Sequence, residues 1–166
     1  MYKVIIALSN INFPTIKGDI YFLEDKKKGI VHIIGQLESN YIKNSYHGFH
    51  IHEAGDLSDN CSGACSHFNP YNKNHGGPND NERHVGDLGN IYFDENGICK
   101  INMNDSYIQL SGEKANIIGR SVVIHNDKDD LGKGIGKDRE ESLKTCIAGK
   151  PIACGIIGYS KLMFTL

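Results

Sequence analysis

The chain has 166 residues, which is enough for one domain with a hydrophobic core and short for two. Its formal net charge of -2 gives no global attraction to nucleic acid or to an anionic membrane, so neither is expected as a partner. No apolar run reaches the roughly 18 residues that a membrane-spanning helix needs, and the N-terminus MYKVIIALSN is too weakly basic for a secretory signal. We therefore expect one domain over residues 1–166 and a cytoplasmic location.

Short runs rich in β-branched and aromatic residues follow one another along the chain and predict strands. These runs are 2–8, 16–23, 30–37, 47–53, 87–94, 98–104, 106–112, 117–125 and 151–160. No stretch of ten or more residues has hydrophobic residues at a helical period. The pattern predicts an all-β fold, an antiparallel sandwich or barrel of about eight strands, with long loops at 61–87 and 126–149.

The first long loop, CSGACSHFNPYNKNHGGPNDNERHVGD, has almost no hydrophobic periodicity. Its Gly, Pro and Asn residues are typical of loops, and loops of this length in a compact domain are generally functional or disordered. It carries four side chains that bind borderline-soft metals, namely His67, His75, His84 and Asp87. A disordered tail would have no reason to collect them, so we interpret the stretch as a loop folded around a metal ion.

Two further histidines lie on a predicted strand. His50 and His52 are two residues apart, so their side chains leave the same face of the strand and can reach one ion. For this pair alone, chance is the better explanation. The loop ligands downstream, together with His125 at the end of another predicted strand, favour a metal site.

The ligand types indicate which metals would fit. His67, His75, His84 and Asp87 offer three nitrogens and one carboxylate, which close a tetrahedral zinc shell and indicate a structural role. The strand histidines supply three nitrogens, and a fourth from His67 would complete the planar set that Cu(II) prefers. His67 would then use both ring nitrogens. As an imidazolate between two dications it would be stabilised, and it would regain a proton if one metal were reduced.

Seven motifs, taken in order, resemble those of copper–zinc superoxide dismutase. They are HGFHIHEAGD (47–56), HFNP (67–70), HGGP (75–78), ERHVGDLGN (82–90), GRSVVIH (119–125), DDLGKG (129–134) and ACGIIG (153–158). The likeness covers nearly the whole chain. It implies an eight-stranded Greek-key barrel or sandwich, copper and zinc ions as cofactors, and superoxide as the substrate.

The resemblance also assigns residues to roles. It implies that copper is bound by His50, His52, His67 and His125, and that zinc is bound by His67, His75, His84 and Asp87. His67 would then be a catalytic residue as well as a shared ligand.

Further roles follow from the same resemblance. Asp129 matches a carboxylate that hydrogen-bonds one copper ligand and one zinc ligand, here His50 and His75. Cys61 and Cys154 match the family's intramolecular disulfide. The other cysteines have no counterpart, and we interpret them as small buried hydrophobes or free thiols; they are Cys65, Cys99 and Cys146.

The rim of the copper channel matches the family except at one position. The residues matching the rim are Glu140, Glu141, Lys144 and Thr145. Pro151 occupies the position of the family's channel arginine, and the nearest cation is Lys150. A lysine carries one flexible ammonium group, whereas an arginine offers a rigid, planar set of hydrogen-bond donors. We therefore expect turnover to survive, with Lys150 as the docking cation, but to be slower than is usual for the family.

The family forms dimers through an apolar patch, which Ile118, Gly119 and Gly155 to Tyr159 match, although these residues could equally form the core. The resemblance favours a homodimer and allows a copper chaperone as a further partner. The alternative function is a non-catalytic copper-handling protein or decoy, which only the Arg-to-Pro change supports. A zinc-only structural protein would leave His50, His52 and His125 without a purpose.

Overall fold

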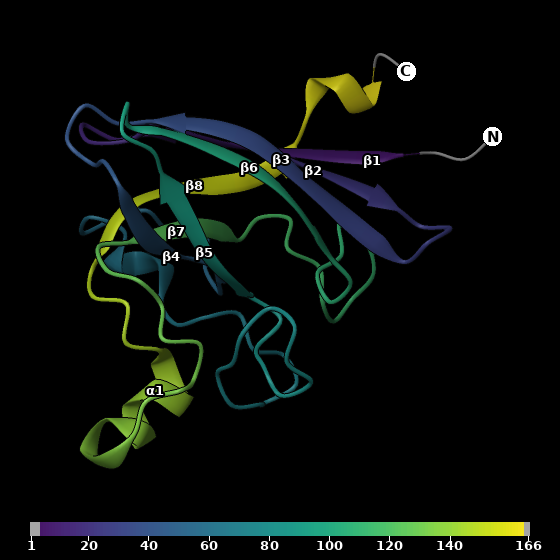
Figure 1. Ribbon diagram of the computed structural model, residues 1–166. Helices are drawn as coiled ribbons and strands as arrows, with labels where there is room; N and C mark the ends of the chain where they lie inside the picture. The colour runs from purple at the N-terminus through teal and green to yellow at the C-terminus, as the bar shows by residue number, and fades with distance from the viewer. Residues whose placement is uncertain (1–3, 165–166) are drawn as a thin grey trace.

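Eight antiparallel strands form a nearly closed barrel in the computed structural model, which describes residues 4–164 and the side chains of residues 4–162 (Figure 1). The strands are β1 (Ile5–Asn12), β2 (Lys17–Asp25), β3 (Ile30–Glu38), β4 (Ser45–His52), β5 (Asp87–Phe93), β6 (Ile98–Asp105), β7 (Ser121–His125) and β8 (Pro151–Tyr159). They pair in the order β5-β4-β7-β8-β1-β2-β3-β6, and the two end strands β5 and β6 pack against each other. The predicted all-β antiparallel fold is confirmed.

The connections between strands are of the Greek-key kind. Strands β4, β5 and β6 follow one another, and β7 returns by a long connection to pair with β4. Strand β8 then pairs with β7, so that Val123 lies opposite Cys154. As a result β4, β7 and β8 lie side by side, although they are far apart in the sequence.

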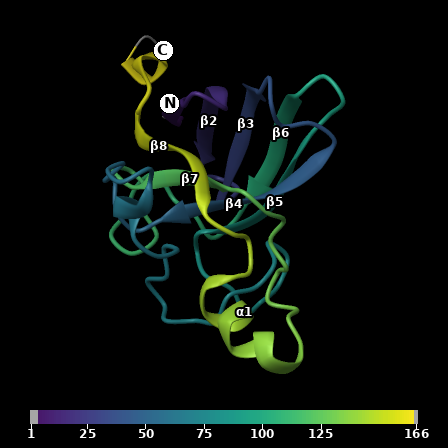
Figure 2. The ribbon, with the colours of Figure 1, turned by 90° about the vertical axis from the view of Figure 1, so that its left-hand side faces the viewer.

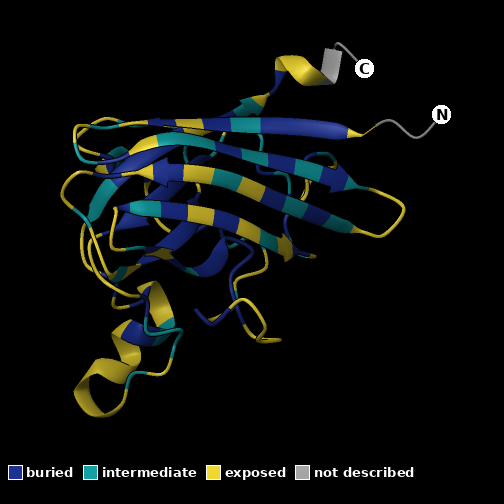
Figure 3. Cartoon of the chain, turned by 45° about the horizontal axis from the view of Figure 1, so that its top comes forward, coloured by how far each residue is buried: buried dark blue, intermediate teal, exposed yellow. Residues whose placement is uncertain are grey.

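Buried hydrophobic side chains fill the barrel interior. Buried residues alternate with more exposed ones along the strands (Figure 3). Phe22, Phe49 and Phe93 come from three different strands and are fully buried. Burying a side chain of this size contributes about 2–3 kcal/mol relative to leaving it in water. The barrel is therefore a firm support for whatever lies on its outer surface.

From His47 to His52, strand β4 is buried on both of its faces. Phe49 and Ile51 belong to the hydrophobic core, whereas His50 and His52 point to the other side and are also buried. The cover is provided by the two long loops, 53–86 between β4 and β5 and 126–150 between β7 and β8. Figures 1 and 2 show that both loops lie on the same side of the barrel.

Two predicted strand segments are wrong. All of residues 106–112 are described and none forms a strand, because carboxylates take up the backbone N–H groups there. Asp105 accepts from Ile108 at 2.8 Å and Glu24 accepts from Leu110 at 3.4 Å. Ile108 and Leu110 are buried, so the alternation of hydrophobic and polar residues here reflects the burial of side chains and not the pairing of a strand. The run predicted over 117–125 becomes a strand only at β7.

The loop predicted over 126–149 contains a short helix, α1 (Arg139–Thr145), that the sequence did not predict. The sequence of α1 shows no hydrophobic residues at helical spacing, and Ser142 is its only buried residue. Glu140 and Lys144, one turn apart, form an exposed ion pair at 2.6 Å. Three 3-10 turns complete the secondary structure: η1 (Ser62–Ala64), η2 (Gly136–Asp138) and η3 (Lys161–Phe164). In the described part of the chain, no helix has the length and apolar character needed to cross a membrane.

Candidate metal centre

Four buried histidines meet on the outer surface of the barrel, and we call them the strand cluster: His50, His52, His67 and His125. Each offers one ligand atom within 4.8 Å of the others. His50 and His52 share a face of β4, and the pairing of β4 with β7 brings His125 beside them. His67 belongs to the loop 53–86, but its backbone forms an isolated bridge with His52. One ion could therefore contact all four rings.

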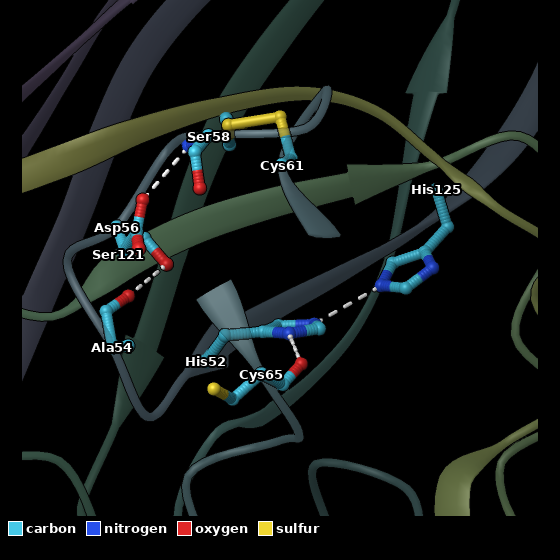
Figure 4. The surroundings of a disulfide bond; sticks show 9 residues. His52, Ala54, Asp56, Ser58, Cys61, Cys65, Ser121 and His125 are labelled. Carbon is cyan, nitrogen blue, oxygen red and sulfur yellow. Dashed lines mark hydrogen bonds between the residues drawn. A yellow bond between two sulfur atoms is a disulfide. The ribbon is translucent and has the colours of Figure 1, made fainter. Parts of the chain in front are cut away.

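The tautomers of two of these rings can be read from their hydrogen bonds. His52 Nδ1 donates to the carbonyl of Cys65 at 2.8 Å, and His125 Nδ1 donates to the carbonyl of Gly149 at 3.0 Å. Each Nε2 atom is then unprotonated. The two Nε2 atoms lie 3.2 Å apart and face each other (Figure 4). Two lone pairs this close repel each other, and a cation held by both would remove that repulsion.

His50 also has one protonated and one unprotonated ring nitrogen, but here the unprotonated one is Nδ1. Its Nε2 lies 2.7 Å from Asp129 Oδ2, and since an ionised carboxylate only accepts, this nitrogen carries the proton. The other nitrogen, Nδ1, is completely buried and has no hydrogen-bond partner among the described residues. A buried acceptor without a partner costs about 1–3 kcal/mol. A metal ion in the strand cluster would supply the missing partner.

A second buried group, the loop cluster, consists of His67, His75, His84 and Asp87. Asp87 Oδ1 lies 2.8 Å from His67 Nδ1 and 3.2 Å from His84 Nδ1, and those two nitrogens are 3.5 Å apart. His75 Nδ1 lies 3.0 Å from Asp87 Oδ2. A tetrahedral ion with bonds of 2.0–2.1 Å holds its donors about 3.3 Å apart, so these separations fit one zinc ion.

His67 is the one residue in both clusters. Its Nδ1 approaches Asp87, which leaves Nε2 for the strand cluster. Its ring centroid is 4.0 Å from that of His50. The neighbouring backbone is fixed by the N–H of Phe68, which donates to the carbonyl of Ile51 at 2.8 Å and so ties the loop to β4.

The buried carboxylate of Asp129 connects the clusters. Its Oδ2 accepts from His50 and its Oδ1 accepts from His75 Nε2 at 2.9 Å, which are the two contacts that the resemblance implied. Asn90 holds the backbone of Asp129 with bonds of 2.7 and 3.0 Å. Asp129 can therefore orient one ring of each cluster at the same time.

Two supporting residues were missed in the sequence. Arg83 is buried, donates to the carbonyl of Asp87 at 2.6 Å and pairs with Asp105 at 2.5 Å, so it anchors the end of the loop to β6. His47 Nδ1 donates to the carbonyl of His125 at 2.9 Å. Both contacts join segments that are distant in the sequence, and no local pattern indicates them.

The protonation of the two clusters differs. Burial, and then the neighbouring imidazoles, lower the pKa of His50 to about 3; burial is also the main cause that lowers the pKa of His125 to about 4. These rings are thus neutral, the form that binds metals. Burial would lower the pKa of His75, but the carboxylates of Asp129 and Asp87 outweigh it and raise that pKa to about 9. Without a metal, His75 is therefore protonated and positively charged. A metal cation in the loop cluster would supply that positive charge instead.

A cavity of about 570 Å³ gives access to the strand cluster, with His52, His67 and His125 on its wall. Of the predicted rim residues, Glu141, Thr145 and Lys150 line it, together with Pro151.

The side chains that line this cavity carry little positive charge. Among the described lining residues, Lys150 is the only lysine or arginine, while Asp127 and Glu141 are acidic. Lys144 does not belong to this described lining; its ammonium group pairs with Glu140 on the exposed side of α1. Pro151 begins β8 opposite His125, where no cationic side chain is available.

The predicted disulfide between Cys61 and Cys154 is present and joins the loop 53–86 to β8 (Figure 4). The remaining thiols are free: Cys65 is exposed, and Cys99 and Cys146 are buried. The sequence did not indicate that Cys146 Sγ would lie 3.6 Å from His67 Nε2.

Comparisons with known proteins agree with this geometry. A family profile described as copper/zinc superoxide dismutase matches residues 16–157. The chain is 49% identical over 163 residues to a copper–zinc superoxide dismutase of Paramecium bursaria Chlorella virus 1, covering 98% of this chain and 82% of the relative. It is 46% identical over 155 residues to an extracellular copper–zinc superoxide dismutase of Brugia pahangi, covering 93% and 75%. A crystal structure described as the clock protein EA4 superposes with a TM-score of 0.87 at 44% identity, covering 96% of this chain and 98% of that one. The chain therefore belongs to the copper/zinc superoxide dismutase family.

Proposed function

We propose that this protein disproportionates superoxide, converting two superoxide anions and two protons into dioxygen and hydrogen peroxide. Copper is bound by the strand cluster and zinc by the loop cluster. The observation that carries the proposal is that His67 belongs to both clusters, with its Nδ1 2.8 Å from Asp87, which leaves Nε2 for the strand cluster.

The assignment of the metals follows from donors and access. The strand cluster offers four imidazole nitrogens, which suit copper, and it borders the cavity. The loop cluster adds a carboxylate to three imidazoles, and all four residues are buried. A closed tetrahedral set of this kind is typical of structural zinc.

Copper held by the strand cluster would supply the one-electron chemistry that the two superoxide anions need. The chain's own residues position the reaction and supply a proton. His67 can hold a proton at Nε2 whenever that atom is free of metal, and can release it towards the peroxide product. The second proton comes from solvent through the cavity. Asp129 keeps the rings of His50 and His75 oriented throughout.

Lys150 is proposed as the residue that attracts the anionic substrate, with smaller contributions from Thr145 at the rim and from Lys144. The charge of Lys144 is largely offset by Glu140, 2.6 Å away. Because Pro151 supplies no donor and Asp127 and Glu141 repel an anion, we expect a rate below that usual for the family.

A homodimer through Ile118, Gly119 and residues 155–159 is also proposed. Ile156 and Tyr159 are 46% and 49% exposed, which is high for large hydrophobic side chains on a terminal strand. A Cβ atom added at Gly119 or Gly158 would meet nothing within 4 Å, so a partner's backbone could approach closely there. Sedimentation of the parent and of Ile156→Glu tests this, with a monomeric parent contradicting it.

A cytoplasmic location is proposed from the exposed free thiol of Cys65, since oxidising compartments favour paired cysteines. One relative is named as extracellular, so cell fractionation is the deciding measurement. A copper chaperone remains a proposed partner, which copper content after expression with and without a candidate chaperone would test.

The activity test uses one protein preparation loaded with copper and zinc or with zinc alone, with both metals measured. We expect dismutation in the first sample and none in the second. A sample that holds one equivalent of each metal but shows no turnover would instead identify a copper-handling protein or decoy.

A further inference from the structure

Cys146 is the free thiol that faces the strand cluster. It follows α1 directly and is 7% exposed. Its Sγ lies 3.6 Å from His67 Nε2. It also belongs to a group with His50 and Asp129 in which one ligand atom of each residue lies within 4.8 Å of the others.

The separation between Sγ and Nε2 is what two donors to one ion require. A tetrahedral ion with a metal–nitrogen bond near 2.0 Å and a metal–sulfur bond near 2.3 Å holds those donors about 3.5 Å apart. The observed 3.6 Å agrees with this distance without movement of either side chain.

A second, independent observation points to a ligand at the same place. His50 belongs to the strand cluster, and its Nδ1 is fully buried and has no hydrogen-bond partner in the described part of the chain. His50 and Cys146 come from segments 96 residues apart (residues 50 and 146), and one ring nitrogen of His50 lies within 4.8 Å of the Cys146 sulfur. Neither observation depends on the other.

The chemistry of sulfur favours one copper oxidation state. Thiolate is a soft donor and selects Cu(I), whereas four imidazole nitrogens suit Cu(II). A site with both donor types can hold copper in either state. Coordination replaces the thiol proton: Cys146–SH and Cu(I) give Cys146–S–Cu(I) and one proton, with no change in oxidation state.

We propose that Cys146 is an additional copper ligand, whose sulfur lies within reach of an ion at His67 Nε2 and binds that ion when it is cuprous and Nε2 holds a proton instead. This rests on the proposed copper site of the strand cluster. It assigns the thiol a role in retaining cuprous ion in addition to that of the histidines.

X-ray absorption at the copper edge tests the proposal on zinc-loaded protein that also holds one equivalent of Cu(I), prepared without air and with ascorbate, so that the disulfide stays intact. The matched variants are Cys146→Ser and the double variant Cys65→Ser/Cys99→Ser, in which Cys146 is the one remaining free thiol. We expect a sulfur neighbour at about 2.3 Å in the parent and in the double variant, and nitrogen neighbours alone in Cys146→Ser. Competition with a Cu(I) chelator should show retention weaker by on the order of tenfold or more in Cys146→Ser.

A spectrum of the parent with nitrogen neighbours alone would overturn the proposal while leaving the copper site itself in place. Persistence of the sulfur signal in Cys146→Ser would overturn it as well. A parent protein that binds no copper would instead refute the proposed function. The parent and double-variant spectra decide the question even if Cys146→Ser fails to fold.

Discussion

The strand cluster and the loop cluster share His67 but are built in different ways. Three of the four ligands in the strand cluster lie on β4 and β7, which pair in register and rest on the hydrophobic core. In the loop cluster three ligands lie in the loop 53–86, and only Asp87 lies on a strand. The barrel therefore positions three ligands of the first site, whereas most of the second site depends on how the loop 53–86 folds.

This difference suits the two sites to different roles. A preformed site can keep its geometry while the charge of its ion changes, which redox chemistry requires. A site made from loop residues gains folding free energy from its metal, and it holds the shared ring in place. The predictions below, in decreasing order of effect, test whether the two sites are separable in this way.

The largest effect is expected from His125→Ala, which removes a ligand held by β7. Dismutation should fall to the uncatalysed rate, because copper loses one of its four nitrogens at the cavity wall. Zinc should stay near one equivalent, since His125 is not a member of the loop cluster. Activity and metal content are measured on the same sample. Activity close to that of the parent would contradict the assignment of the strand cluster.

Asp87→Ala should have the opposite profile. Asp87 Oδ2 also accepts the backbone N–H groups of Gly76 at 3.1 Å and His84 at 2.8 Å, so the substitution removes both a ligand and the loop's internal bonds. We expect zinc affinity to fall by more than about 100-fold, beyond what loss of an outer hydrogen bond causes. Hydrogen exchange should rise over residues 66–86 while β4 and β7 stay protected. Equal loss of protection in the strands would show that the sites are not separable.

The disulfide is expected to matter for the stability of the metal-free chain. Cys61 and Cys154 are 93 residues apart, and closing a loop of this length disfavours the unfolded chain by about 4–5 kcal/mol in the chain-entropy model. The double substitution to serine should lower the free energy of unfolding in urea by a comparable amount. Cys65→Ser, at an exposed free thiol, is the control. A decrease no larger than that of the control would refute this role.

Asp129→Asn should weaken both sites together by about 10–100-fold in metal affinity. A neutral amide removes the negative charge to which both His50 and His75 donate, and it offers the two rings only one oxygen acceptor. Asp138→Asn, at an exposed position in the same loop, serves as the matched control. Competition titrations with copper and zinc chelators measure the effect, and a change at one metal alone would argue against a shared carboxylate.

The smallest effect is expected at the cavity rim. Lys150→Ala should lower kcat/KM by roughly tenfold at low ionic strength, with the loss shrinking as salt is added. Lys144→Ala should cost less, because Glu140 already offsets its charge. Pro151→Arg should raise kcat/KM above the parent by supplying a fork of donors. An unchanged rate for Lys150→Ala would remove Lys150 from the mechanism.

Much of this architecture could be predicted from the sequence because local patterns encode it. Alternation at period two predicted the strands and placed His50 and His52 on one face. The collection of metal-binding side chains in a Gly- and Pro-rich loop predicted the loop cluster, and both groups assemble as expected. Where the pattern was wrong, at 106–112, burial without strand pairing produced the same alternation.

The remaining features depend on contacts that no local pattern reports. Helix α1 has no hydrophobic stripe, and its formation follows from the way the loop 126–150 covers the site. The approach of Cys146 to His67 arises from the same cover. Arg83 reaches Asp105 only because the end of the first loop passes over β6. Each requires the tertiary fold.

The sharing of His67 between two different metals is tested most directly by a crystal structure of the copper- and zinc-loaded protein, with anomalous scattering recorded at both absorption edges. We predict a copper peak within about 2.0–2.2 Å of His67 Nε2 and a zinc peak at a similar distance from Nδ1. A single metal peak, or a His67 ring bonded to one ion only while both sites are filled with oxidised copper and zinc, would contradict this account.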